Sequence, residues 1–233
     1  MTATGAALRI IAIDGPAGAG KSTVARALAA RLGLEYLDTG AMYRAVAYAA
    51  LRRSIPLDDQ PAVVAFTRDV SLEVGEYGVL VDGVDATSEV RSPNVTRSVA
   101  AVAANAGVRA ELVRRQREWA RIRGGGVIEG RDIGSVVFPD AVLKLYLTAS
   151  PQVRAERRVA EAGGDINDIA AQIEARDASD QARLHGPLTE AAGAVVVDTS
   201  GLSIDAVLER IEQLLADDAS GDAPGDAPVG TAE

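Results

Sequence analysis

Residues 15–22 read GPAGAGKS, a complete G-x-x-x-x-G-K-[ST] phosphate loop that directly follows the apolar run 8–13. A β-strand that feeds a glycine-rich turn and then a helix leaves several backbone N–H groups without internal partners, all pointing at one spot. An anion placed there accepts these hydrogen bonds and meets the positive end of the helix dipole. Lys21 adds a mobile charge for the β- and γ-phosphates, and the Ser22 hydroxyl is placed to ligate Mg²⁺. Because strand, loop and helix agree, the sequence predicts a nucleoside triphosphate site.

The composition of the chain narrows the class of protein. The 233 residues are 48% apolar and 24% charged, which is ordinary for a globular protein long enough to bury a sizeable core. There is no cysteine, so disulfides and thiolate metal sites are excluded. The first residues lack the pattern of a signal peptide, and no apolar run approaches the ~18 residues of a membrane span. We therefore expect a cytoplasmic protein.

The net charge of −9 is concentrated toward one end. Residues 217–233 contain five acidic residues and no basic one, and they are rich in Gly, Asp, Ala and Pro. Such a stretch buries too little apolar surface to order itself, so it is predicted to be a disordered tail. Lysine is nearly absent from the chain, with Lys21 and Lys144 against 22 arginines.

Short apolar segments indicate the fold class. Helical patterns separate five of them, which typifies right-handed βαβ units and a parallel sheet covered on both faces. The expected strands are residues 8–13, 35–37, 126–128, 143–147 and 194–197. The sequence thus predicts a three-layer α/β fold with a five-stranded parallel sheet. Ligand sites in such sheets lie beyond the carboxyl ends of the strands.

Two segments do not fit this alternation. Residues 70–74, 79–81 and 84–86 look like a small antiparallel meander, with Asp82 and Gly83 as its hairpin turn. Residues 151–183 are helical in pattern and rich in arginine. We expect core segments at 1–40, 108–150 and 184–216, an insertion at 41–107, a lid at 151–183 and the tail at 217–233.

Polar residues follow two of the expected strands. After the second strand, Asp38 or Thr39 can cap a helix, Gly40 allows close approach of a ligand, and Arg44 lies one turn in. Arginine is unfavourable at that helix end, so it suits an anion, although a solvated surface arginine would look the same. After the third strand come Arg131 and Asp132, flanked by glycines, which fit either a phosphate site or a structural ion pair.

These positions suggest two phosphate-bearing ligands that face each other. The phosphate loop would hold a donor triphosphate, and Arg44 and Arg131 would hold an acceptor phosphate beneath the lid arginines. A phosphate acceptor has a second pKa of about 6 and is largely ionised at neutral pH, so it needs no general base. The single histidine, His185, stands beside Gly186 and is expected to be a loop residue without a chemical role.

Four segments resemble a known family: residues 14–23 (DGPAGAGKST), 37–44 (LDTGAMYR), Arg109 with 114–117 (RRQR), and 129–141 (EGRDIGSVVFPDA). Together they closely resemble the bacterial cytidylate kinases, from about residue 8 to residue 212. The resemblance implies a P-loop kinase fold with a monophosphate-binding insertion, which carries the meander, and a helical lid. It implies the transfer of a phosphoryl group from ATP to CMP or dCMP with Mg²⁺, and the small molecules as partners rather than nucleic acid or membrane.

The resemblance also assigns roles to matching positions. The implied ATP-binding residues are Gly15, Pro16, Ala17, Gly18, Ala19, Gly20, Lys21, Ser22 and Thr23, with Ser22 on the metal. The implied CMP-binding residues are Thr39, Tyr43, Arg44, Arg109, Arg131, Asp132, Arg176, Asp180 and Arg183. The implied catalytic residues are Lys21, Arg131, Arg157, Arg158 and Arg183, with Arg183 approaching the transferring phosphate.

Base recognition in this family would fall to Arg109 and Asp132. A carboxylate accepts the N4 amino group of cytosine and repels the carbonyl of uracil. Arg176 and Asp180 would meet the sugar, and their spacing with Arg183 places the three on one helical face, as a solvated face would also do. One departure is the alanines at 100 and 101, where the family often has a serine near the base; Ser98 or water would then take that contact.

Three alternatives stay open at this point. The chain could be another kinase of the same fold, acting on UMP, shikimate or dephospho-coenzyme A. It could be a nucleotide-dependent switch, although no Asn-Lys-x-Asp element is present. It could bind nucleic acid through the arginines of 109–123, which are more simply a solvated helical face with Arg109 in the site. Because the insertion and the lid must move freely, we expect a monomer.

Overall fold

The computed structural model describes residues 8–76 and 78–220. Its core is a five-stranded sheet in which every pair of neighbouring strands is parallel, in the order β2-β6-β1-β7-β8. The strands are β1 (Arg9–Asp14), β2 (Tyr36–Asp38), β6 (Gly125–Glu129), β7 (Leu143–Thr148) and β8 (Val195–Asp198). The predicted parallel sheet is confirmed, with strand ends displaced by at most one residue.

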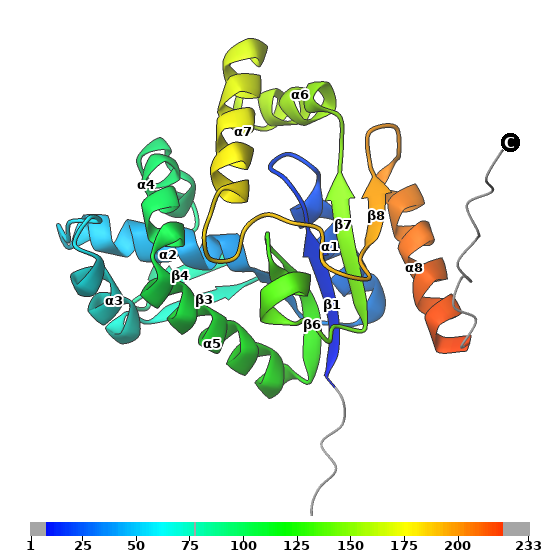
Figure 1. The fold of residues 1–233 in the computed structure, drawn as a ribbon, viewed down its shortest axis with the longest axis horizontal. Coiled ribbons are helices and arrows are strands. Elements are labelled where there is room, and N and C mark those ends of the chain that lie inside the picture. Colours follow the sequence, from blue (N-terminus) through cyan, green and yellow to red (C-terminus); the bar gives the residue numbers. More distant parts are fainter. Residues whose placement is uncertain (1–7, 77, 221–233) are drawn as a thin grey trace, which may run out of the picture.

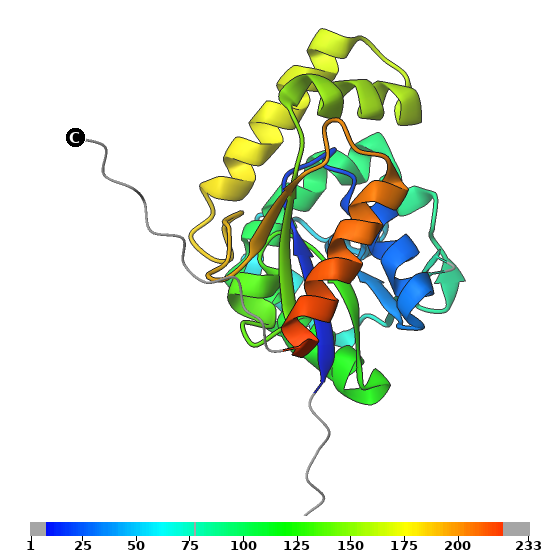
Figure 2. The same ribbon diagram turned by 90° about the vertical axis from the view of Figure 1, so that its right-hand side faces the viewer.

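Helices cover both faces of this sheet, and the alternation of side chains along β1 shows why. Ile11 and Ile13 pack into one apolar cluster with α1 (Lys21–Leu32) and α8 (Ile204–Ser220). Figure 2 shows α8 lying across this face of the sheet. Ile10 and Ala12 belong to the opposite cluster, which includes α2 (Thr39–Arg52) and α5 (Ala106–Arg123). A central strand whose two sets of side chains are both apolar has to be buried on both sides.

The insertion between β2 and α5 has an apolar cluster of its own. Its elements are α3 (Gln60–Asp69), β3 (Leu72–Gly75), β4 (Gly78–Val81), β5 (Val84–Asp85), the 3₁₀ turn η1 (Glu89–Arg91) and α4 (Pro93–Ala104). The three strands form the predicted antiparallel meander, in the order β3-β4-β5. Asp82 and Gly83 both have positive φ, the requirement of a tight type I′ hairpin turn. Val70, Val81 and Val90 pack with the alanines of α2.

The arginine-rich segment forms two packed helices, α6 (Pro151–Ala162) and α7 (Ile166–Gln181), above the carboxyl ends of the strands (Figure 1). A loop then returns to β8 and carries His185, exposed as expected. The last helix, α8, continues to Ser220, so the chain is still helical beyond residue 217, where disorder was expected to begin. Residues 221–233 of the expected tail lie outside the described residues. Within 8–76 and 78–220, none of the helices combines the length and apolar character that a membrane span requires.

Candidate active site

The phosphate loop joins β1 to α1 at the carboxyl edge of the sheet. Gly15 has a φ of +143°, and a Cβ there would overlap the Leu147 carbonyl oxygen of β7, so only glycine fits. Helix α1 begins at Lys21 after Gly20 in the left-handed region, and no described side chain caps it. Its first N–H groups are therefore available to an anion, as the sequence predicts.

Lys21 is buried inside this loop, and its Nζ donates to the Pro16 carbonyl oxygen at 2.6 Å. Burial, followed by the positive charge of Arg131, lowers the pKa of Lys21 to about 7. Arg176 acts in the same direction, while Glu129 and Asp14 oppose it. A buried lysine surrounded by further cations is typical of a site that binds an anion of several charges. The structure therefore places Arg131 and Arg176 close to the donor loop.

Glu129, the last residue of β6, lies against the phosphate loop. Its buried carboxylate accepts a hydrogen bond from the Tyr36 hydroxyl, and burial raises its pKa. An acid at the end of the strand beside the phosphate loop is where P-loop enzymes hold Mg²⁺ together with the loop Ser or Thr. Sequence reasoning missed this role, although the run Val127-Ile128-Glu129, an apolar strand ending in an acid, was a signal for it.

The donor set fits Mg²⁺ that arrives with a nucleotide. Among the residues that the structure describes, no group of three or more His, Cys, Asp or Glu could hold a metal by itself. Mg²⁺ usually keeps several waters and takes one or two protein oxygens in addition to substrate phosphates. Ser22 and Glu129 supply that number.

A second cationic cluster begins at the end of β2. Asp38 caps α2 by accepting the Ala41 N–H at 2.8 Å, and its other oxygen pairs with Arg44 at 2.8 Å. Burial favours the neutral acid, but Arg44 and the Ala41 N–H hold the pKa of Asp38 below its usual value. Arg91 of η1 reaches the same carboxylate at 3.7 Å and is half exposed. The buried Nε of Arg44 has no partner among the described residues. Arg91 was not predicted from the sequence.

Residues of α7, and of the segments that follow α7 and β6, form further ion pairs here. Arg131 Nε lies 2.7 Å from Asp180 Oδ2, and Asp180 also pairs with Arg183. Arg176 lies one turn before Asp180, and burial followed by the Arg131 charge lowers its pKa to about 10. Arg44 acts on Arg176 in the same direction. Arg176, Asp180 and Arg183 therefore line the site and do not form a solvated helical face.

Arg109 and Asp132 form a buried ion pair at the acceptor side. The residues are 4% and 5% exposed, and the Arg109 guanidinium lies over the Tyr43 ring at 5.8 Å. One nitrogen of Arg109, Nη1, is buried with no hydrogen-bond partner in the described part of the chain. Burial raises the pKa of Asp132, while Arg109, Arg183 and Arg131 oppose that rise. A pair with one unused donor and a carboxylate is suited to a planar ligand that offers both an acceptor and a donor.

Comparisons with known proteins agree with this geometry. A family model described as cytidylate kinase matches residues 11–217. The chain belongs to the cytidylate kinase family. It is 47% identical to the cytidylate kinase of Desulfitobacterium hafniense (strain Y51) over 215 residues, covering 89% of this chain and 92% of the relative.

Other relatives are longer or more distant. The chain is 52% identical to a bifunctional pantoate ligase/cytidylate kinase of Synechococcus sp. (strain JA-2-3B'a(2-13)) over 88% of its own length, and it spans 40% of that relative. The solved structure of a gluconokinase from Sinorhizobium meliloti 1021 is 16% identical with a TM-score of 0.50, covering 92% of this chain and 95% of the gluconokinase. That likeness shows the P-loop kinase fold alone.

Helices α6 and α7 of this cytidylate kinase family member contact the phosphate loop. Asp177 of α7 accepts the Ala17 N–H at 3.0 Å and pairs with Arg154 of α6, which donates to the Ala17 carbonyl oxygen at 3.1 Å. The predicted Arg157 donates to the Thr199 hydroxyl and carbonyl oxygens at 2.9 and 2.7 Å, beside the phosphate loop. Arg158 is partly exposed and pairs with Glu161. Asp177 and Arg154 were not predicted.

Arg183 pairs with Asp180, and its charge opposes the rise in the pKa of both Tyr43 and Asp132. Its approach to the transferring phosphate stays a prediction. Thr39, whose hydroxyl donates to the Glu129 carbonyl oxygen at 2.7 Å, is buried between the two clusters. The structure thus groups Arg183 with Tyr43, Arg109 and Asp132.

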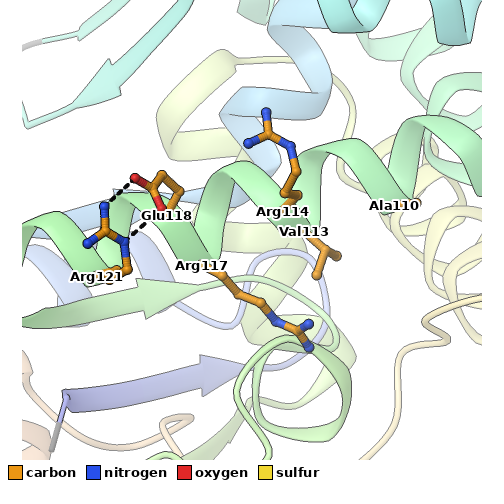
Figure 3. Close-up of a pocket in the computed structure, with 6 residues that line it drawn as sticks. All are labelled: Ala110, Val113, Arg114, Arg117, Glu118 and Arg121. Carbon is orange, nitrogen blue, oxygen red and sulfur yellow. Dashed lines mark hydrogen bonds and ion pairs between the residues drawn. The ribbon is translucent and has the colours of Figure 1, made fainter. Parts of the chain in front are cut away.

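Four arginines of α5 other than Arg109 bind groups within the protein, and Figure 3 shows three of them. Arg114 and Arg121 pair with glutamates three residues away on the same helix. Arg117 donates to the carbonyl oxygens of residues 136 and 137, and Arg115 to those of residues 67, 68 and 70. The expectation of a solvated face is therefore wrong for Arg115, whose largely buried guanidinium binds carbonyls of a neighbouring segment, whereas Arg117 is exposed as expected. Arginines that already bind groups of the protein would have to release them to bind the phosphates of a nucleic acid.

Proposed function

We propose that this protein transfers the γ-phosphoryl group of ATP to CMP or dCMP, giving CDP or dCDP. The observation that carries the proposal is the buried Arg109–Asp132 pair, with its unpartnered Nη1, close to Arg131. Membership of the cytidylate kinase family supports the same substrate. The cytoplasmic location and the monomeric state stay predictions.

Base discrimination follows from the polarity of the pair. Cytosine presents an amino donor at N4 and acceptors beside it, so Asp132 accepts the amino group while Arg109 Nη1 donates to an acceptor. Uracil presents a carbonyl at the same position, which a carboxylate repels. A buried site whose polar groups lose their partners with the wrong base discriminates strongly, because there is no water to replace them.

Phosphoryl transfer in this site rests on positioning and charge. The amides of the phosphate loop and Lys21 bind the donor phosphates, while Arg44 and Arg131 bind the acceptor phosphate. Arg176, whose charge is felt by both Lys21 and Arg131, would stabilise the charge that develops between the two substrates. Ser22 and Glu129 would hold Mg²⁺, which when bound supplies positive charge next to the donor phosphates. The acceptor oxygen is already ionised at neutral pH, so no side chain has to remove a proton.

The lid would exclude water during transfer. Arg157 and Arg158 lie on α6, which is joined to the donor loop through Arg154 and Asp177. Closing such a lid keeps the triphosphate away from water until an acceptor is bound. Hydrolysis without an acceptor should therefore be slow, which separates a kinase from a nucleotide-dependent switch.

A coupled assay of ADP formation with CMP, dCMP, UMP, AMP or no acceptor tests the proposal. The expected order is CMP or dCMP above UMP and AMP, with little turnover when no acceptor is present. A matched control is Arg121→Ala, which removes an exposed arginine of α5 that pairs only with Glu118. Preference for UMP or AMP, or rapid hydrolysis without an acceptor, would contradict the proposal.

A further inference from the structure

The turn that follows Asp132 lacks the cap that its sequence leads one to expect. This π-helical turn, η2 (Ile133–Val137), begins directly after Asp132, which stands at its N-cap position. An aspartate there normally accepts the N–H of the second or third residue of the helix. The Asp132 side chain makes no such bond, because its carboxylate is paired with Arg109.

Asp14, the last residue of β1, caps the turn instead. Its Oδ1 accepts the Ile133 N–H at 2.9 Å, and its Oδ2 accepts the Gly134 N–H at 2.8 Å. Asp14 is 3% exposed and lies immediately before the phosphate loop. A residue 119 positions earlier in the chain therefore caps the turn that carries the base-reading carboxylate.

The other end of the turn is also held. The Arg117 guanidinium donates to the Val136 and Val137 carbonyl oxygens, each at 3.0 Å, and Figure 3 shows its side chain reaching from α5 to this turn. With both ends fixed, the start of the turn has a defined position relative to the sheet. Of these two residues, Asp14 holds the end of the turn that is next to Asp132.

We infer that Asp14 is a positioning residue for base recognition, which caps the turn in place of Asp132 and so leaves the Asp132 carboxylate available to Arg109 and the cytosine edge. The inference rests on the proposed function. Because Asp14 also borders the phosphate loop, it links the position of the base-reading residue to the donor site. It touches neither base nor phosphate itself.

The buried surroundings of Asp14 oppose its ionisation. Burial raises its pKa to about 6, against the effect of the two N–H donors. The titratable groups that face it are Lys21 of α1, Asp132, and Tyr146 of β7. An acid whose pKa is raised on folding contributes stability below its unfolded pKa and loses that contribution as the pH rises through about 6. At neutral pH the ionised group costs folding free energy.

Asp14→Asn is the direct test. The amide oxygen can accept one N–H, but the amide nitrogen faces the other, so one donor of the turn is left without an acceptor. Asp132, at the N-cap position, is the acceptor that the turn would recruit. We expect the CMP-to-UMP ratio of kcat/KM to fall about tenfold, the size of one charge-assisted hydrogen bond, mostly through the KM for CMP. ATP affinity measured without an acceptor should not change.

A double-mutant cycle distinguishes a positioning role from a nonspecific structural effect of the substitution. If Asp14 acts through Asp132, adding Asp14→Asn to Asp132→Asn should not lower the ratio further. The matched control is Asp165→Asn, because Asp165 also accepts two consecutive N–H groups, those of Asn167 and Asp168, at an exposed helix start. The control should keep the wild-type ratio.

The outcomes separate this inference from the proposed function. If the wild type does not prefer CMP to UMP, both fail. If the wild type prefers CMP and Asp14→Asn keeps the same ratio, only the positioning role fails. If Asp14→Asn does not fold, amide hydrogen exchange on the ligand-free wild type tests the cap instead. Slow exchange at the Ile133 and Gly134 amides supports the cap. Exchange at the rate of an unprotected amide overturns it.

Discussion

Replacing Asp132 by asparagine should change which base the enzyme accepts more than it changes the chemistry. The carboxylate and Arg109 are both almost completely buried, so solvent screens their interactions with a base very little. Asparagine keeps the size of the side chain but presents an amide whose nitrogen can donate to the uracil carbonyl. The loss of one hydrogen bond to a buried charged group is worth about 1.5–3 kcal/mol.

That free energy sets the expected kinetics. One decade in a rate ratio corresponds to about 1.4 kcal/mol, so the CMP-to-UMP ratio of kcat/KM should fall by roughly 10- to 150-fold. The fall should come partly from a lower KM for UMP, while kcat with CMP changes less. Because Arg109 keeps an oxygen partner in the variant, the stability loss should be smaller than the ~3–5 kcal/mol of a broken buried pair.

The assay is the coupled measurement of ADP formation with CMP and UMP as separate acceptors, on wild type and variant. Glu118→Gln is the control, because Glu118 pairs with Arg121 on the exposed side of α5. Thermal unfolding of each variant shows whether the fold survives. Identical CMP-to-UMP ratios in wild type and Asp132→Asn would refute the base-reading role of the carboxylate.

Three further changes test other parts of the site. Lys21→Ala should abolish transfer but leave CMP binding by calorimetry within about twofold, because Lys21 serves the donor; a large loss of CMP affinity would contradict separate subsites. Glu129→Gln should raise the Mg²⁺ concentration for half-maximal rate by about tenfold without changing CMP affinity, whereas an unchanged Mg²⁺ titration would exclude Glu129 from the metal site. Asp177→Asn weakens the link between lid and Ala17, so acceptor-independent ATP hydrolysis should increase several-fold; hydrolysis as slow as in the wild type would show that Asp177 does not help exclude water.

Local patterns were enough to predict most of the fold. The strands of the core are short apolar runs, and the turn at Asp82 and Gly83 has the dipeptide that a type I′ hairpin needs. The capping of α2 by Asp38 and the common face of Arg176 and Asp180 also follow from spacing along the chain. Each of these features depends on residues close together in sequence.

The residues that were missed act through partners far away in the chain. Asp177 is 160 positions from Ala17, and Asp14 is 119 from Ile133, so no local pattern links them. Arg115 looks like a solvated helix residue until the insertion is placed beside α5. Glu129 differs, because its position after an apolar strand could have been recognised from the sequence alone.

Direct phosphoryl transfer requires that donor and acceptor phosphates meet in one site, and a bisubstrate ligand measures this most directly. Adenosine and cytidine joined through five phosphates should bind once per chain, at least 100-fold more tightly than ATP or CMP, since the second half binds at an effective concentration in the millimolar range or above. Excess ATP and excess CMP should each displace it. Binding no tighter than ATP, or simultaneous binding of CMP, would show that the two anion sites do not face each other.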